Sequence, residues 1–227
     1  AKTTVVTAYA VTAAGFLKYT RVMNMSDIMA LDIETGNFSW EIGGWDKHSL
    51  FEPTVVCTWD GTDGHAFSKE DVDMVNATVH PLHPRLLGEH LEKHVNGGGK
   101  ILGHNIRKFD LPVLNAALDC WTAGDLMSKS ESIIDTKLLI DKAALGVGKV
   151  HTTLDTLART TLDLSKSMQS SDAPVAWREG KYLEVADYCL KDCQLTYDLY
   201  RYGQENGIVK SRNMEDGSIV EIEVDWI

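Results

Sequence analysis

The sequence predicts a single mixed α/β domain. Short apolar runs of strand length come first along the chain, helical patterns interleave with them later, and turns rich in Gly or Asn separate them. The length of 227 residues, with 44% hydrophobic and 24% charged residues, suits one well-buried globular domain. We therefore assign residues 1–227 to one domain whose central sheet is flanked by helices.

The first part of the chain is predicted to consist mainly of strands. Residues 3–12 and 16–23 are rich in Val, Thr and Tyr and flank an Ala-Ala-Gly turn, so residues 1–25 are expected to form an N-terminal hairpin. Residues 28–33 form a short apolar run that ends in acidic residues, and residues 54–59 form another strand that an Asp-Gly turn closes. A loop rich in glycine and aromatic residues is expected between these two strands.

Helical patterns dominate the later part. Leucines and a valine recur at helical spacing over residues 85–95, and a run of three glycines ends that helix. The longest helical pattern covers residues 181–206. The other predicted elements are a strand at 100–103, a helix at 109–118, a strand end and helix at 133–144, a helix at 153–161 and an edge strand at 219–227.

Composition and charge argue against two classes of protein. The sequence has no apolar run of the ~18–20 residues that a membrane span needs, so we do not expect a membrane protein. The net charge of −11 is the wrong sign for a protein that coats nucleic acid through a broad basic surface. An enzyme that grips only a strand end remains compatible, because bound cations supply positive charge locally.

The four cysteines are interpreted as reduced core residues. Cys57, Cys120, Cys189 and Cys193 include no Cys-x-x-Cys pair, and a disulfide framework is typical of much shorter secreted chains. We expect a reducing compartment, namely the cytoplasm of the cell or, for a viral protein, of its host. A metal-ligand pair formed by Cys189 and Cys193 is the weaker alternative, because a third and fourth soft ligand are missing at useful spacing.

Acidic residues in three distant segments are predicted to form one metal site. Asp32 and Glu34 are two apart on a strand, so their side chains project from the same face. Asp110 lies near a helix start, and Tyr188 and Asp192 are four apart on a helix, with Cβ atoms about 5–6 Å from each other. Carboxylates so close repel one another, and a divalent cation relieves that repulsion.

The expected chemistry is phosphodiester hydrolysis. Two divalent cations about 3.5–4 Å apart make a bound water nucleophilic and stabilise the leaving oxygen. Hard ions such as Mg²⁺ take oxygen ligands, which is what a cluster of carboxylates offers. The sequence therefore predicts a site for two divalent cations, Mg²⁺ or Mn²⁺.

Three motifs, at residues 32–35, 105–110 and 188–192, carry a family resemblance. Asp-x-Glu-Thr, Asn-x-x-x-Phe-Asp and Tyr-x-x-x-Asp, in this order, resemble the motifs of DEDD 3′–5′ exonucleases of the ribonuclease H-like superfamily. The tyrosine is typical of the DEDDy branch, which includes proofreading domains of DNA polymerases and RNase D. The histidine branch has His five residues before the last acid, where this chain has Asp187.

Further segments resemble one group of that branch, the exonuclease domains related to those of family-B DNA polymerases, including versions fused to helicases. The resemblance covers roughly residues 28–227. The segments are Ile-Gly-Gly-Trp at 42–45, His-Asn at 104–105, Leu-Asp-Thr-Leu-Ala at 154–158, Lys-Ser at 166–167, Trp-x-x-Gly at 177–180 and residues 200–207.

The resemblance implies a ribonuclease H-like mixed sheet and release of nucleoside 5′-monophosphates from the 3′ end of single-stranded DNA. It implies that Asp32 bridges both cations, that Glu34 and Asp192 complete the nucleophile side, and that Asp110 holds the leaving-group side. Tyr188 would position the attacking water, because a phenol with an ordinary pKa near 10 orients water more readily than it deprotonates it.

The resemblance also implies contacts with the strand end. Residues after the first motif would wedge against the terminal base, although the leucine common in that wedge is absent here. The candidate substrate-binding residues are Thr35, Asn37, Phe38, Trp40, Asn105 and Phe109. A polymerase or a helicase is a candidate protein partner.

Other interpretations stay open at this point. An RNA exonuclease of the RNase D type would use the same site, and a non-catalytic module that docks on a polymerase or helicase is a rival from another class.

Asp135 is interpreted as a helix cap rather than a fifth acid, and Trp121 as a core residue. His90 and His94 are interpreted as an exposed helix face rather than a zinc site, and Lys166 as either a phosphate contact or solvent-exposed.

Overall fold

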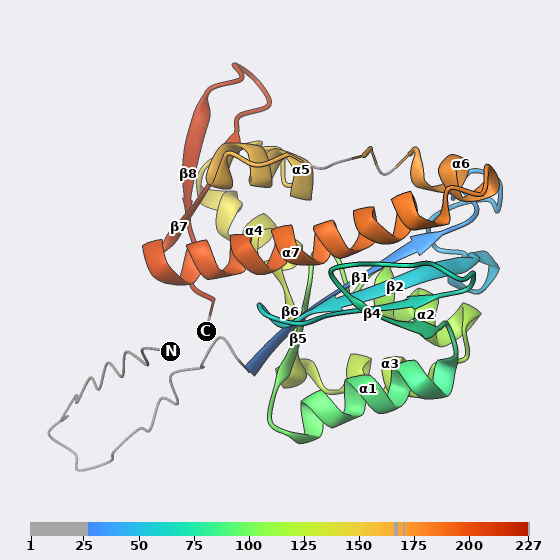
Figure 1. The fold of residues 1–227 in the computed structure, drawn as a ribbon. Helices are drawn as coiled ribbons and strands as arrows, with labels where there is room; N and C mark the ends of the chain where they lie inside the picture. Colours follow the sequence, from blue (N-terminus) through green and yellow to red (C-terminus); the bar gives the residue numbers. More distant parts are fainter. Residues whose placement is uncertain (1–26, 166–167, 170, 227) are drawn as a thin grey trace, which may run out of the picture.

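The computed structural model describes residues 27–165, 168–169 and 171–226. The predicted hairpin of residues 1–25 and Lys166 lie outside this part of the chain. A six-stranded mixed sheet forms the centre, in the order β4-β3-β2-β1-β5-β6 (Figure 1). Its strands are β1 (Ile28–Thr35), β2 (Pro53–Trp59), β3 (Gly64–Ser68), β4 (Thr78–Pro81), β5 (Lys100–Gly103) and β6 (Ile133–Asp135). The predicted mixed α/β fold is confirmed, and the sheet is compatible with a ribonuclease H-like fold.

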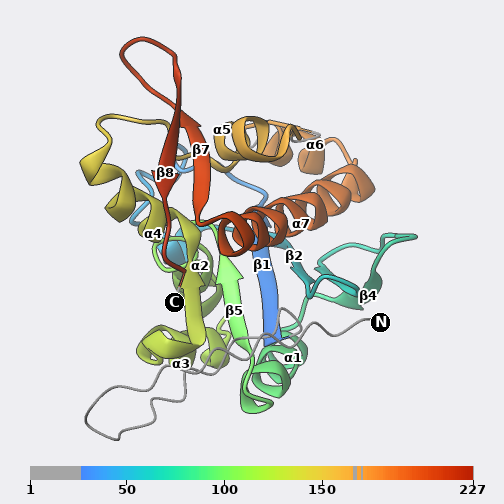
Figure 2. The same ribbon diagram turned by 90° about the vertical axis from the view of Figure 1, so that its left-hand side faces the viewer.

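The pairing of β1 determines where polar side chains gather. β1 runs antiparallel to β2 and parallel to β5, which in turn runs parallel to β6. The β1–β5 pairing covers only Ile28–Ala30, so the carboxyl half of β1 continues past the end of β5. Because β1, β5 and β6 run in the same direction, their carboxyl ends meet on one side of the sheet (Figure 2). In open α/β sheets this is the side where ligands bind.

Helices cover both faces of the sheet (Figures 1 and 2). One core contains Met29, Leu31 and Ile33 of β1 and packs against α1, α2 and α3, and the other contains Ile28 and Ala30 and packs against α7. The helices are α1 (Pro84–Asn96), α2 (Asp110–Ala117), α3 (Trp121–Ser128), α4 (Thr136–Ala143), α5 (Leu154–Leu157), α6 (Ala173–Arg178) and α7 (Tyr182–Asn206). None of the helices in the described ranges is long and apolar enough to span a bilayer.

Several elements differ from the sequence-based expectation. The strands β3 and β4 and the helices α3 and α6 were not predicted, and Trp121 is 87% exposed rather than in the core. The helix predicted at 153–161 begins as α5, capped by Thr153, and continues as a π-helical turn (Ala158–Leu162). The terminal strand is shorter than expected, because β8 (Ile219–Glu223) pairs only with β7 (Ile208–Arg212) in a separate two-stranded sheet.

Gly103, at the carboxyl end of β5, is required by close packing. A Cβ atom added there would lie 2.5 Å from Cβ and 2.8 Å from Cδ1 of Ile106, which is itself fully buried. We expect Gly103→Ala to lower the free energy of unfolding by about 1–3 kcal/mol, as overpacking typically does. Urea denaturation monitored by circular dichroism measures this change. Gly146→Ala is the matched control, because a Cβ there would meet nothing within 4 Å. Equal midpoints for both variants would contradict the packing argument.

Candidate metal centre

Strand alternation brings the first two carboxylates to the face that α7 covers. Ile28 and Ala30 of β1 belong to the core beneath α7, and Asp32 and Glu34 continue the same alternating row. Glu34 is buried and Asp32 is half-buried. The row therefore changes from apolar to acidic where β1 extends beyond β5.

Buried thiols tie α7 to the sheet at this point. The Cys189 thiol donates to the backbone carbonyl of Asp32 at 3.3 Å, and the Cys193 thiol donates to that of Cys57 at 3.2 Å. Burial raises the pKa of both thiols well above the ordinary value, so they stay protonated. Because a metal ligand must be a thiolate, this environment disfavours the Cys189–Cys193 metal pair. The thiols instead help to fix the register of α7, and with it the position of Asp192.

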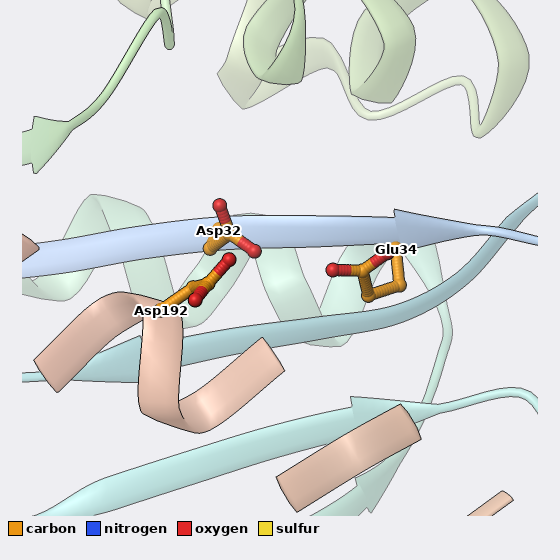
Figure 3. Close-up of side chains that lie close together, drawn as sticks. All are labelled: Asp32, Glu34 and Asp192. Atoms are coloured by element: carbon orange, nitrogen blue, oxygen red, sulfur yellow. The ribbon is translucent and has the colours of Figure 1, made fainter. Parts of the chain in front are cut away.

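Three carboxylates meet as a result. One oxygen from each of Asp32, Glu34 and Asp192 lies within 4.8 Å of the others, and Figure 3 shows the carboxyl groups of Asp32 and Asp192 beside each other with Glu34 further along β1. Two oxygens on opposite sides of a Mg²⁺ ion at 2.0–2.1 Å would be about 4.2 Å apart. Small side-chain movements would therefore let all three bind one divalent cation. These residues fit a hard metal ion, because all their donor atoms are carboxylate oxygens.

Asp110 lies beside this group but outside it. It begins α2, is buried, and accepts a hydrogen bond from the backbone amide of Ile33, between the two acids of β1. The pKa of Asp110 is raised to about 7, mainly by desolvation and also by the nearby carboxylates of Asp135 and Asp192, against the lowering effect of the backbone hydrogen bonds. Three of the four predicted ligand carboxylates thus form a compact group, and the fourth is coupled to it electrostatically.

Asp135 is a helix cap, as predicted. Its carboxylate accepts hydrogen bonds from the backbone amides of Leu138, at the start of α4, and of Asn105 and Arg107, in the loop after β5. These three amides compensate the charge of a buried carboxylate. Asp135 therefore joins the loop at Asn105 to α4. Asn105 itself has a left-handed backbone with φ of 78°, a conformation in which Asn is enriched.

Tyr188 lies on α7 one helical turn before Asp192. Its side chain is only 1% exposed, so the phenol is enclosed by protein in this state. The spacing of four residues keeps both side chains on the same side of the helix. The predicted role in positioning a water stays a prediction.

Thr35 and Asn37 lie at the start of the loop that follows β1. The Thr35 hydroxyl donates to the Asn37 carbonyl at 3.0 Å. The Asn37 side chain donates to the carbonyl of Leu50 and accepts from the amide of Glu52, at 2.8 and 3.0 Å. Both residues are buried, and these bonds hold the base of the loop. Their predicted contact with substrate is untested.

Phe38 and Trp40 form an aromatic platform in which Phe38 is half-buried and Trp40 is exposed. Their rings stack with centroids 5.1 Å apart, and Trp40 is 73% exposed. The Arg178 guanidinium lies 5.5 Å from the centre of the Phe38 ring and bonds to both oxygens of Glu41, at 2.9 and 2.6 Å. Arg178 also donates to the carbonyl of Gly36 at 2.9 Å, so α6 holds this loop. Sequence reasoning did not find the Arg178–Glu41 pair.

Phe109 packs within an aromatic cluster next to Asp110. Its ring lies edge-on to Phe51 and to Trp45, with centroids 5.1 and 5.5 Å apart. Aromatic pairs in this geometry stabilise a fold beyond the area that they bury. Phe109 therefore supports the start of α2.

His90 and His94 do not share a metal site in the structure. His90 bonds through Nε2 to the hydroxyl of Thr58, and His94 bonds to the backbone carbonyl of Lys100. Both are half-buried, in contrast to the predicted exposed face. Among the described residues, the only group of three or more His, Cys, Asp or Glu side chains arranged to hold a metal is that of Asp32, Glu34 and Asp192.

No protein-family model matches this chain, and no curated protein matches it either. The motifs, the fold and the geometry of the carboxylates are therefore what indicates a function for this protein.

Proposed function

We propose that this protein is a metal-dependent 3′–5′ exonuclease of the DEDDy type, which hydrolyses single-stranded DNA from its 3′ end. One observation carries the proposal: Asp32, Glu34 and Asp192 bring ligand oxygens within 4.8 Å of one another. Asp110 lies against the same strand. These four acids belong to the three motifs that define the family resemblance.

The resemblance implies the roles of the acids, and the compact group of Asp32, Glu34 and Asp192 supports the first of them. Asp32, Glu34 and Asp192 would hold one divalent cation, and Asp110 together with Asp32 would hold a second. When bound, two such cations make a water nucleophilic near neutral pH and stabilise the leaving 3′ oxygen. Tyr188 would donate or accept a hydrogen bond that orients the attacking water, which fits its position one turn from Asp192.

The aromatic platform would receive the strand end. Stacking of bases on Phe38 and Trp40 would tolerate any sequence and contribute about 1–3 kcal/mol per base. Sequence-tolerant binding suits an enzyme that removes successive nucleotides. The net charge of −11 is compatible with this mode, because the enzyme would contact a short length of strand.

Parallel digestions test the proposal. Single-stranded DNA, duplex DNA and RNA oligomers of matched sequence, each labelled at the 5′ end, would be incubated with Mg²⁺, with Mn²⁺ or with EDTA. We expect a ladder that shortens from the 3′ end of single-stranded DNA, release of nucleoside 5′-monophosphates, and no cleavage in EDTA. Cleavage of RNA alone would favour the exoribonuclease alternative. Absence of cleavage with either metal would favour a non-catalytic docking module.

The role of Tyr188 can be separated from that of the ligands. We expect Tyr188→Phe to reduce kcat by about 100-fold, the lower end of the range for a positioned acid–base group, because Tyr188 would orient the water rather than deprotonate it. Metal affinity measured by calorimetry should stay within twofold of the wild-type value. Tyr200→Phe is the matched control, because Tyr200 is equally buried on α7 but bonds to the Trp226 carbonyl near the chain end. A large loss of metal affinity in Tyr188→Phe would instead indicate a ligand role.

A further inference from the structure

A small hollow lies at the carboxyl ends of β5 and β6. It has a volume of about 30 Å³. Asn105, Arg107 and Lys108 line it from the loop after β5, and Lys137 and Asp141 line it from α4. It is thus built from one of the three motif segments and from a helix outside all of them.

The hollow is basic, although the protein as a whole is acidic. Arg107, Lys108 and Lys137 contribute three positive charges. Asp135 and Asp141 also line it and contribute two negative charges, so the lining has a formal net charge of +1. The Asp135 carboxylate accepts hydrogen bonds from three backbone amides, which leaves Asp141 as the acid that pairs with a cation of the hollow. A site of this charge within a chain of net charge −11 favours an anion.

Two of the positively charged side chains, Arg107 and Lys137, are held in place by hydrogen bonds. Arg107 donates through Nη2 to the carbonyls of Ser130 and Ile133 at 2.7 and 2.9 Å. The Lys137 ammonium lies 3.2 Å from both Asp141 oxygens and 2.8 Å from the Thr152 hydroxyl. Side chains that are already ordered lose less entropy when they bind a ligand. The hollow is therefore preorganised on two sides.

The hollow is also close to the carboxylates. β1, β5 and β6 are consecutive neighbours in the sheet, so the end of β6 is about 10 Å from β1 at the usual strand spacing. Asp135, which contributes to the floor, is near enough to Asp110 to influence its ionisation. The hollow is therefore within reach of an anionic chain whose end lies at the carboxylates.

We propose that this hollow binds a backbone phosphate of the substrate strand, upstream of the linkage that is cut. This inference rests on the proposed exonuclease function and deepens it by assigning a second contact point for the strand. Lys137 and Lys108 would contact the phosphate oxygens as charge-assisted donors. Asn105 would add an amide donor from the rim. The contact would hold the strand while its 3′ end lies at the carboxylates, without taking part in the cleavage itself.

Charge variants of Lys137 test the proposal. Lys137→Gln is expected to raise KM for a single-stranded 10-mer about tenfold, the size expected for loss of one charge-assisted contact, with kcat changed less than twofold. Lys137→Arg should restore most of the affinity, and Lys108→Ala should act in the same direction as Lys137→Gln. Lys129→Gln is the matched control, because Lys129, directly after α3, also pairs with an aspartate four residues away, Asp125, and does not line the hollow. Unfolding curves of each variant verify the fold.

Two further measurements isolate the phosphate. In EDTA, the slope of log binding constant against log salt should be smaller by about 0.7 for Lys137→Gln than for the wild type, which corresponds to one contact on a single strand. A single neutral methylphosphonate, moved along the oligomer, should weaken wild-type binding at one position and leave Lys137→Gln unaffected there. The p-nitrophenyl ester of thymidine 5′-monophosphate has no upstream phosphate, so wild type and Lys137→Gln should cleave it equally.

The outcomes separate this inference from the proposed function. If wild type cleaves DNA and Lys137→Gln keeps the wild-type KM and salt slope, the phosphate site is wrong and the exonuclease proposal stands. If wild type cleaves neither DNA nor the ester, the proposed function fails. The binding measurements in EDTA then still decide whether the hollow holds a phosphate. An unchanged salt slope in Lys137→Gln would overturn the phosphate site, and a reduced slope would support it.

Discussion

Asp32→Asn is expected to reduce Mg²⁺-dependent release of nucleotides by about 10³-fold or more, the size of the charge stabilisation that metal ions supply. Asp32 is the acid from which both proposed cations would take a ligand, and it shares the compact group with Glu34 and Asp192. The amide keeps the shape of the carboxyl group but not its charge. Cleavage of 5′-labelled single-stranded DNA, followed by gel electrophoresis, measures the rate, and calorimetry measures the loss of Mn²⁺ binding.

A matched loss of charge elsewhere serves as the control. Asp125 lies on α3, which packs in the core on the face of the sheet opposite to α7, and its side chain is 74% exposed. Asp125→Asn therefore removes the same charge outside the compact group. Its activity should stay within twofold of wild type. If Asp32→Asn retained wild-type activity, the carboxylates of β1 and α7 would not be the catalytic centre.

The compact part of the site could be predicted from local rules. Alternation along a strand is enough to put Asp32 and Glu34 on one face. Helical spacing is enough to put Asp192 on the same side of α7 as Tyr188. The motif order suggested that these segments would meet, and the parallel pairing of β1 and β5 agrees with this. The periods of 2 and 3.6 residues predict which face of each element carries the acids, and the motif order predicts that the faces meet.

Other features depend on contacts between distant residues. The Arg178–Glu41 pair joins positions 137 residues apart, and no local pattern links them. The influence of Asp135 on the pKa of Asp110 exists only because the start of α2 and the end of β6 lie close together. Trp121 was predicted to be buried from its residue type alone, yet it begins α3 on the surface. Hydrophobicity does not say which apolar side chains the sheet has room to cover.

Asp110→Asn is expected to stabilise the metal-free protein at pH 8 while abolishing metal-dependent cleavage. In the folded metal-free protein the pKa of Asp110 is about 7, mainly because the carboxyl group is desolvated, whereas the unfolded chain has the ordinary value of 3.8. The folded state therefore holds its proton more tightly than the unfolded chain. The stability that this provides is fully present below pH 4 and is lost as the pH rises from about 4 to about 7.

Above pH 7 the folded protein must bury an ionised carboxylate next to other acids. The cost is on the order of 2–4 kcal/mol, and the neutral amide of Asp110→Asn avoids it. Urea denaturation at pH 4, 6 and 8 in EDTA should show the variant gaining stability over wild type as the pH rises, with little difference at pH 4. The free energy of unfolding of Asp125→Asn should change with pH in the same way as that of the wild type.

Divalent metal should reverse this order, and the reversal links stability to function. A cation bound only by the folded state stabilises it according to the ratio of its concentration to its dissociation constant. Wild type, with four acids, should gain more stability from saturating Mn²⁺ than Asp110→Asn, which has three. If the variant were no more stable than wild type in EDTA at pH 8, burial of the ionised Asp110 carboxylate would not have the free-energy cost that we infer. If Mn²⁺ stabilised both proteins equally, Asp110 would lie outside the metal centre, and a single cation held by Asp32, Glu34 and Asp192 would be the better description.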